Sequence, residues 1–127
     1  MKCYIAGAWA DAKRIAEART LMQSVGWEVT SQWIDLALTN GGSETTNDWA
    51  AAARRDYEDI DRSQVVIVDI LSDHTKGGRE WEGGYAVGTN KLAYVVGPPR
   101  TPFLYAVSRR FDSWEECASV LKQPPAD

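Results

Sequence analysis

One carboxylate in the chain is placed where it could act on a ligand. Glu82 opens the run Glu82-Gly83-Gly84-Tyr85-Ala86-Val87-Gly88 and follows the pair Gly77-Gly78. We expect it just inside the start of a helix, beyond the end of a buried strand. There the helix dipole would lower the pKa of the carboxyl group and keep it ionised at neutral pH, as a nucleophile requires. An acidic residue in a first helical turn is also common for structural reasons alone, since the dipole stabilises it by roughly 0.3–1 kcal/mol.

Two other acidic residues bear on the role of Glu82. Glu80 lies two residues earlier and is its rival, because helix positions two apart point in different directions and only one can face a cleft. Asp56 lies on another expected helix, where its ordinary interpretation is an exposed charge. The residues alone decide neither whether Glu80 or Glu82 faces the cleft nor whether Asp56 is more than an exposed charge.

The elements that must position these residues alternate along the chain. Short apolar runs predict strands at Lys2–Ala6, Trp27–Thr30, Val65–Val68 and Leu92–Val96. Helical spacing and capping residues predict helices over about 10–25, 49–62, 79–89 and 113–121. The expected caps are Gly26 at the end of the first helix, Thr46 or Asn47 before the second, and Asp112 or Ser113 before the last. Residues 33–47 are predicted to form a loop.

This alternation predicts an α/β fold, a three-layer sandwich around a mostly parallel, flavodoxin-like or Rossmann-like sheet. Residues 1–122 should form a single domain, followed by a short tail at 123–127. Ligands of such sheets bind beyond the carboxyl ends of the strands. The segments 7–9 and 72–82 should therefore face each other.

Composition narrows the classes of partner. The 127 residues carry a net charge of -4, which argues against duplex nucleic acid and favours a small-molecule ligand. No apolar stretch approaches the roughly 20 residues of a membrane span, and Met1-Lys2 leads directly into a strand, so we expect a cytoplasmic protein. Cys3 and Cys117 lack metal-ligand spacing and are expected in the core, and with His74 as the only histidine no metal site is expected.

Two common nucleotide motifs are missing. The turn Gly7-Ala8-Trp9 after the first strand lacks the further glycines of a dinucleotide fingerprint, so no nicotinamide, flavin or other cofactor is expected. Gly77-Gly78-Arg79 could form a phosphate-accepting nest, but the ending of a P-loop is absent. Trp9 and Trp81 fall in the expected site, where an aromatic ring could face a base or sugar, although packing is the commoner role.

Three segments together resemble the nucleoside 2-deoxyribosyltransferase family, which includes deoxynucleoside monophosphate N-glycosidases. They are the turn Tyr4–Trp9, the run Asp56–Ile60 and, most specifically, Glu82-x-Gly84-x-Ala86. The resemblance implies that Glu82 attacks C1′ of a 2-deoxyribonucleoside, that Asp56 protonates the departing base and that Tyr4 orients Glu82. It also implies a substrate pocket near Gly7, Trp9, Gly78, Arg79 and Trp81.

The resemblance leaves the substrate open. Ala8, Trp9 and Ala10 stand where the monophosphate hydrolases have a serine and an arginine, which favours a nucleoside unless Lys13, Arg14 or Arg79 binds a phosphate. Another N-riboside, or a non-catalytic nucleotide-binding module, are the alternatives. The resemblance further implies a homodimer or higher homo-oligomer with shared active sites, in which residues 101–110 could reach a partner's pocket.

Overall fold

A single parallel sheet forms the centre of the molecule. The computed structural model describes residues 1–40, 48–74, 77–98, 101–102 and 107–125. The sheet has the strand order β2-β1-β3-β4-β5, and each neighbouring pair is parallel. Its strands are β1 (Lys2–Ala6), β2 (Glu28–Val29), β3 (Val65–Asp69), β4 (Leu92–Val96) and β5 (Arg109–Phe111). This is the flavodoxin-like order, in which the direction of winding reverses between β1 and β3.

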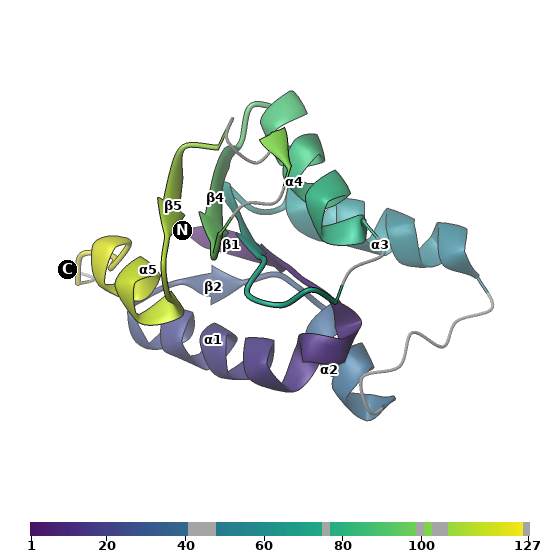
Figure 1. Cartoon of the computed structure of the whole chain (residues 1–127), viewed down its shortest axis with the longest axis horizontal. Helices are drawn as coiled ribbons and strands as arrows, with labels where there is room; N and C mark the ends of the chain where they lie inside the picture. The colour runs from purple at the N-terminus through teal and green to yellow at the C-terminus, as the bar shows by residue number, and fades with distance from the viewer. Residues whose placement is uncertain (41–47, 75–76, 99–100, 103–106, 126–127) are drawn as a thin grey trace.

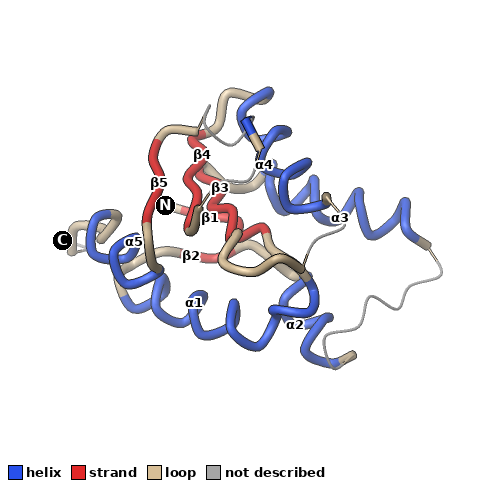
Figure 2. The backbone as a smooth tube through the Cα atoms, viewed as in Figure 1, coloured by secondary structure: helices blue, strands red, loops and turns tan. Residues whose placement is uncertain are grey.

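Helices cover both faces of the sheet, so the predicted three-layer α/β sandwich is confirmed. One layer contains α1, α2 and α5, and the other contains α3 and α4 (Figures 1 and 2). The helices are η1 (Trp9–Asp11, a 3-10 turn), α1 (Ala12–Ser24), α2 (Trp33–Thr39), α3 (Trp49–Asp61), α4 (Gly78–Gly88) and α5 (Trp114–Val120). Gln123 N donates to Val25 O at 2.9 Å, so the packing continues one residue beyond 122.

The two central strands hold the core together. Every residue of β3 is buried, as expected of a continuously apolar strand covered on both faces. β1 lies beside it with Tyr4 opposite Val66, and Tyr4 is fully buried. Cys3 and Cys117 are both buried free thiols, as predicted.

The structure corrects the expected loop at 33–47. Residues Trp33–Thr39 form α2, and the part of the expectation at 41–47 lies outside the described residues. The first free backbone amide of this helix is satisfied from elsewhere in the chain, because Gln32 N donates to Asp59 Oδ2 at 3.0 Å. A helix start that depends on a distant carboxylate leaves no local capping signal in the sequence.

The helix caps agree with expectation in part. Asp48, not Thr46 or Asn47, caps α3, since its carboxylate accepts from Ala51 N at 2.9 Å. The two residues named in the expectation lie outside the described part of the chain. Ser113 caps α5, as one of the two predicted choices, by accepting from Glu116 N at 3.1 Å.

A fifth strand was not predicted. Residues 109–111, which overlap the segment 101–110 expected to reach a partner's pocket, form β5 and pair with β4 of the same chain. The strand is three residues long and two of them are exposed arginines, so it lacks the apolar signal of the other strands. Residues 109–110 therefore lie at the sheet edge. Contact of the segment 101–110 with a partner subunit stays a prediction, and residues 103–106 lie outside the described part of the chain.

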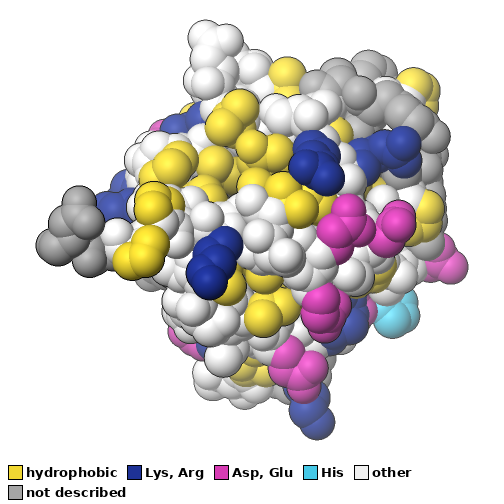
Figure 3. All heavy atoms as spheres, turned by 90° about the vertical axis from the view of Figure 1, so that its left-hand side faces the viewer, with side chains coloured by type: hydrophobic (Ala, Val, Ile, Leu, Met, Phe, Trp, Pro, Cys, Tyr) yellow, Lys and Arg dark blue, Asp and Glu magenta, His cyan; other side chains and the backbone are white. Residues whose placement is uncertain are grey.

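Hydrophobic side chains reach the surface on the side of the molecule where β5 and α5 lie. Figure 3 shows several of them gathered in one area of that face, with most of the charged side chains to one side of it and below. None of the helices in the described segments is both long and apolar enough to cross a bilayer.

Candidate active site

The side chains of Tyr4 and Glu82 meet between β1 and α4. The Tyr4 hydroxyl donates to Glu82 Oε2 at 2.5 Å. Tyr4 comes from the central strand and has no solvent exposure, whereas Glu82 is partly buried. The pairing of these two residues, inferred above from resemblance, is thus present as a direct contact.

Asp56 approaches the same place from α3. It is half-buried, and its negative charge is one cause of the raised pKa of Glu82 and of Tyr4. Burial raises the pKa of Asp56 itself, while Arg55, whose Nη2 lies 3.1 Å from Asp56 Oδ1, opposes that rise. The structure therefore brings together three of the predicted residues, Tyr4, Asp56 and Glu82.

The electrostatic state of Glu82 differs from expectation. Burial, and then the charge of Asp56, raise its pKa from 4.5 to about 8, despite the opposing hydrogen bond from Tyr4. The predicted lowering by the helix dipole fails for a geometric reason. α4 begins at Gly78, so Glu82 lies in the second turn, where the field of the terminus has declined, and Glu80 is the acidic residue of the first turn.

Glu80 and Arg79 are engaged with each other. Arg79 Nε donates to Glu80 Oε1 at 2.9 Å, and Arg79 Nη1 donates to Ser72 O at 2.9 Å. Arg79 is 3% exposed. Its guanidinium thus holds the loop before α4, and the carboxylate of Glu80 points to it, whereas that of Glu82 points to β1.

The two predicted glycines have different surroundings. A Cβ at Gly7 would lie 2.3 Å from Ile15 Cδ1, so close packing of α1 on the end of β1 explains this glycine. Within the described residues, a Cβ built on Gly77 or Gly78 would meet no other segment within 4 Å, and Gly77, the residue before α4, lies in the left-handed region with φ of 92°. The start of α4 is therefore open, and a role of Gly7 or Gly78 in binding stays a prediction.

The two candidate tryptophans are also placed differently. Trp9, in η1, is partly buried and packs against the core. Trp81 is 70% exposed, and its indole N–H donates to the Tyr57 hydroxyl at 2.5 Å. Tyr57 in turn packs on Tyr85, with ring centroids 4.5 Å apart. Their contact with a substrate likewise stays a prediction.

The loops after β1 and β3 face each other, as predicted. The Ser72 hydroxyl donates to Asp11 Oδ2, and His74 Nδ1 lies 3.2 Å from Asp11 Oδ1. Behind them Arg14 binds both carboxylate oxygens of the fully buried Asp69, at 2.7 and 2.8 Å. This network fixes the edge of the sheet beside the site.

Several polar residues that build the site were not predicted from the sequence. They are Asp11, Arg55, Asp59 and Asp69. The position of Asp69 directly after a buried strand was a usable signal, because parallel strands point their carboxyl ends to one edge. The other three resemble ordinary helix charges in the sequence and differ only through tertiary contacts.

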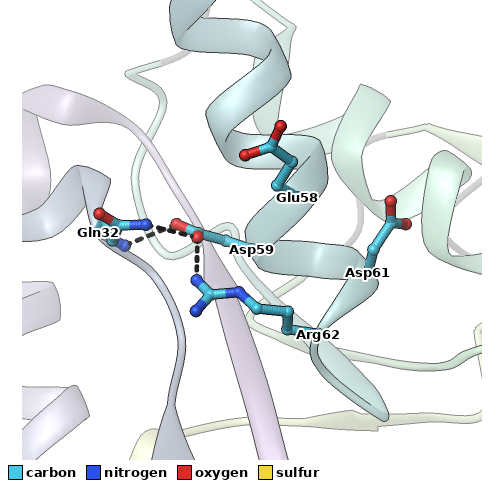
Figure 4. Close-up of a pocket in the computed structure, with 5 residues that line it drawn as sticks. All are labelled: Gln32, Glu58, Asp59, Asp61 and Arg62. Carbon is cyan, nitrogen blue, oxygen red and sulfur yellow. Dashed lines mark hydrogen bonds and ion pairs between the residues drawn. The ribbon is translucent and has the colours of Figure 1, made fainter.

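A pocket lies between the C-terminal half of α3 and the chain before α2. It has a volume of about 520 Å³ and is lined by Gln32, Glu58, Asp59, Asp61 and Arg62 (Figure 4). It shares α3 with Asp56 but is not lined by Tyr4, Asp56 or Glu82. In the described segments no group of three His, Cys, Asp or Glu side chains could hold a metal ion.

Two half-buried carboxyl groups and the hydroxyl of a tyrosine come together beside the central strand of a flavodoxin-like sheet. Such a pair of carboxyl groups is typical of enzymes that use side chains as acid, base or nucleophile. The chain belongs to the nucleoside 2-deoxyribosyltransferase family, whose model matches residues 3–115. Membership of this family makes it an enzyme that cleaves or transfers the N-glycosidic bond of nucleosides. A comparison with curated proteins gave no match.

Two solved structures show the same fold. A 2-deoxyribosyltransferase from Bacillus psychrosaccharolyticus is 15% identical, with a TM-score of 0.72 and coverage of 100% of both chains. The CMP N-glycosidase BcmB of Clostridium botulinum is 15% identical, with a TM-score of 0.63 and coverage of 95% of this chain and 98% of that one.

Proposed function

We propose that this enzyme cleaves 2-deoxyribonucleosides with Glu82 as the nucleophile and Asp56 as the acid. The hydrogen bond from Tyr4 to Glu82 carries the proposal, because it holds one carboxylate oxygen and leaves Oε1 for attack. Asp56, whose pKa is raised by burial, supports the role of proton donor. The arrangement matches the two-carboxylate logic of retaining glycoside cleavage.

In the first step the reactive form of the pair carries its one proton on Asp56 and has Glu82 ionised. This is the minor form near neutral pH, because the pKa of about 8 keeps the proton mostly on Glu82. Glu82 Oε1 bonds to C1′ as the C1′–N bond breaks. The electron pair of that bond goes to the base, which takes the proton of Asp56. A sugar without a 2′-hydroxyl reaches the required oxocarbenium-like transition state readily. The product is a deoxyribosyl ester of Glu82 and a free base.

In the second step a new nucleophile attacks C1′ of the ester. An acceptor base or a water molecule bonds to C1′, gives a proton to Asp56 and releases the Glu82 carboxylate. A base yields a new nucleoside and water yields deoxyribose. How well the site excludes water decides between transferase and hydrolase.

A nucleoside fits the described site better than a nucleotide. Two of the cations considered for a phosphate are already bonded, Arg79 to Ser72 O and Glu80, and Arg14 to Asp69. Lys13 is exposed on α1. Nucleoside 5′-monophosphates are the alternative substrates, with the open start of α4 at Gly78 as the place for a phosphate.

The experiment is to incubate the protein with deoxyinosine or thymidine, with and without adenine, and to separate bases and nucleosides by chromatography. The corresponding 5′-monophosphates form a parallel series. We expect free base from the nucleosides, and new deoxyadenosine when adenine is present and the enzyme is a transferase. Measurable binding of these compounds without any turnover would contradict the proposal, and turnover of monophosphates alone would correct the substrate.

We further propose a homodimer or higher homo-oligomer with shared active sites, located in the cytoplasm. The apolar face beside β5 and α5 supports self-association, and the two buried free thiols suit a reducing compartment (Figure 3). Light scattering coupled to size exclusion tests the assembly. A monomer at every concentration that retains full activity would refute shared sites.

A further inference from the structure

Asp59 is a fully buried carboxylate with no part in the proposed chemistry. Its Oδ1 accepts from Gln32 Nε2 at 2.8 Å, and its Oδ2 accepts from Gln32 N at 3.0 Å. The Thr30 hydroxyl donates to the Asp59 carbonyl oxygen at 2.9 Å. Figure 4 shows Gln32 reaching Asp59 from the chain before α2, with Arg62 approaching from the next turn of α3.

A buried carboxylate in this position lowers the stability of the fold unless it is well paired. Asp59 forms an ion pair with Arg62, whose side chain is 55% exposed, so the counter-charge is largely in water. An apolar residue at a buried helix position is often at least as stable as an ion pair. The two bonds to Gln32 therefore indicate a requirement for Asp59 that goes beyond filling space.

Asp59 lies on α3 three residues after Asp56, and positions three apart share one face of a helix. We propose that Asp59 is a positioning residue for the catalytic pair, in that its bonds to Gln32 fix the rotation of α3 and so hold Asp56 against Glu82, while its charge adds to the negative field there. This inference rests on the proposed function of the pair. Asp59 itself touches neither the substrate nor the reacting atoms.

The charged groups around Glu82 determine how the charge of Asp59 affects its pKa. From β1 it faces Tyr4, and from α3 it senses Asp56 and Asp59, which raise its pKa, and Arg55, which lowers it. On its own helix Glu80 is bonded to Arg79. Removal of the Asp59 charge should thus favour the ionised form of Glu82.

The test compares Asp59→Asn with Asp61→Asn in the full-length protein. Asp61 is a matched control, because it is an exposed carboxylate on the same helix and accepts from the Tyr85 hydroxyl. Two readouts are used, kcat with a deoxynucleoside and the titration of the Glu82 carboxyl carbon by NMR, assigned with Glu82→Gln. The titration does not depend on turnover, so it still tests the charge effect if the proposed reaction is wrong.

For Asp59→Asn we expect kcat to fall about ten-fold and the Glu82 titration midpoint to move down by roughly half a pH unit, since one nearby negative charge is lost. Asp61→Asn should change neither. Gln32→Met should lower kcat without lowering the midpoint, because it breaks the contact and keeps the charge. Arg62→Met should raise the midpoint, because a nearby positive charge is lost. If Asp59→Asn does not fold, Gln32→Met and Arg62→Met test the positioning role and the charge effect in its place. A less stable Asp59→Asn whose kcat and midpoint equal those of the wild type would show a purely structural residue and overturn the proposal.

Discussion

The Tyr4 hydroxyl donates a 2.5 Å hydrogen bond to Glu82 Oε2 and so joins the central strand β1 to α4. The contact spans 78 positions of sequence, and it ties a fully buried side chain of the central sheet to a partly buried carboxylate. Its consequence is that Glu82 cannot turn away without breaking a charge-assisted bond. Position and protonation of the proposed nucleophile are therefore set by the fold.

Removal of the Tyr4 hydroxyl should slow the reaction and raise the pKa of Glu82 further, because that bond favours the ionised form. For Tyr4→Phe we expect kcat/KM at neutral pH to fall roughly 10–100-fold, the range of a hydrogen bond to a charged group. Tyr85→Phe is the control, since Tyr85 lies on α4 and its hydroxyl donates to Asp61 outside the site. Equal activity of the two variants would remove Tyr4 from the mechanism.

The loss of rate caused by removing the Asp56 carboxyl group should depend on the leaving group. Asp56→Asn should lower kcat on deoxyinosine by about 10²–10⁴-fold, the usual range for loss of a general acid. The same variant should release the first equivalent of 4-nitrophenolate from 4-nitrophenyl 2-deoxyriboside at a nearly unchanged rate, because this leaving group needs no proton. The comparison uses that first release, since later turnover also needs Asp56 to accept a proton in the second step. Glu58→Gln, an exposed carboxylate on the same helix, serves as the control. An equal loss on both substrates would show that Asp56 does not act as the acid.

The pH profile should also depend on the leaving group. With the nitrophenyl substrate only ionised Glu82 is needed, so kcat/KM should rise with pH to a midpoint near 8, the pKa of Glu82. With deoxyinosine the pair must retain one proton, so activity should fall above about that same pH. Initial rates measured across the pH range check both limbs. A nitrophenyl profile that is flat from mildly acidic to alkaline pH would mean that Glu82 is already ionised.

Glu82 should destabilise the fold at alkaline pH. Its pKa is raised from 4.5 to about 8 on folding, so the folded state binds the proton more tightly than the unfolded state. The protonated carboxyl group is therefore tolerated at low pH, and the free energy of unfolding falls as the pH rises from about 4.5 to about 8. Glu82→Gln should match the wild type near pH 4 and exceed it by at most about 5 kcal/mol above pH 8. Urea unfolding at several pH values measures the difference. A gap that does not change with pH would exclude the raised pKa.

The fold could be predicted wherever local pattern and burial agree. The run Val65–Val68 is apolar throughout because both its faces are covered, and β3 lies there. α2 and β5 could not be predicted because their signals are not local. Asp59 supplies the bond that starts α2, and β4 supplies the partner that makes Arg109–Phe111 a strand.

For the candidate site, the sequence predicted which side chains come together but not their protonation. Glu82 and Asp56 were recognised from motifs, and the structure brings them together with Tyr4. The pKa of Glu82 depends on burial by β1 and α3, and these segments are distant in sequence. The helix dipole alone predicts a lowered pKa for Glu82, and that direction is wrong.

The most direct test of the central claim compares Glu82→Ala with Glu80→Ala, two carboxylates on one helix with different partners, Tyr4 and Arg79. The measurement is the rate of base release from deoxyinosine, with circular dichroism to show that both variants are folded. We expect Glu82→Ala to lose turnover by at least about a thousand-fold, as expected for loss of a nucleophile. Glu80→Ala should stay within a few-fold of the wild type. An active Glu82→Ala beside an inactive Glu80→Ala would contradict the account.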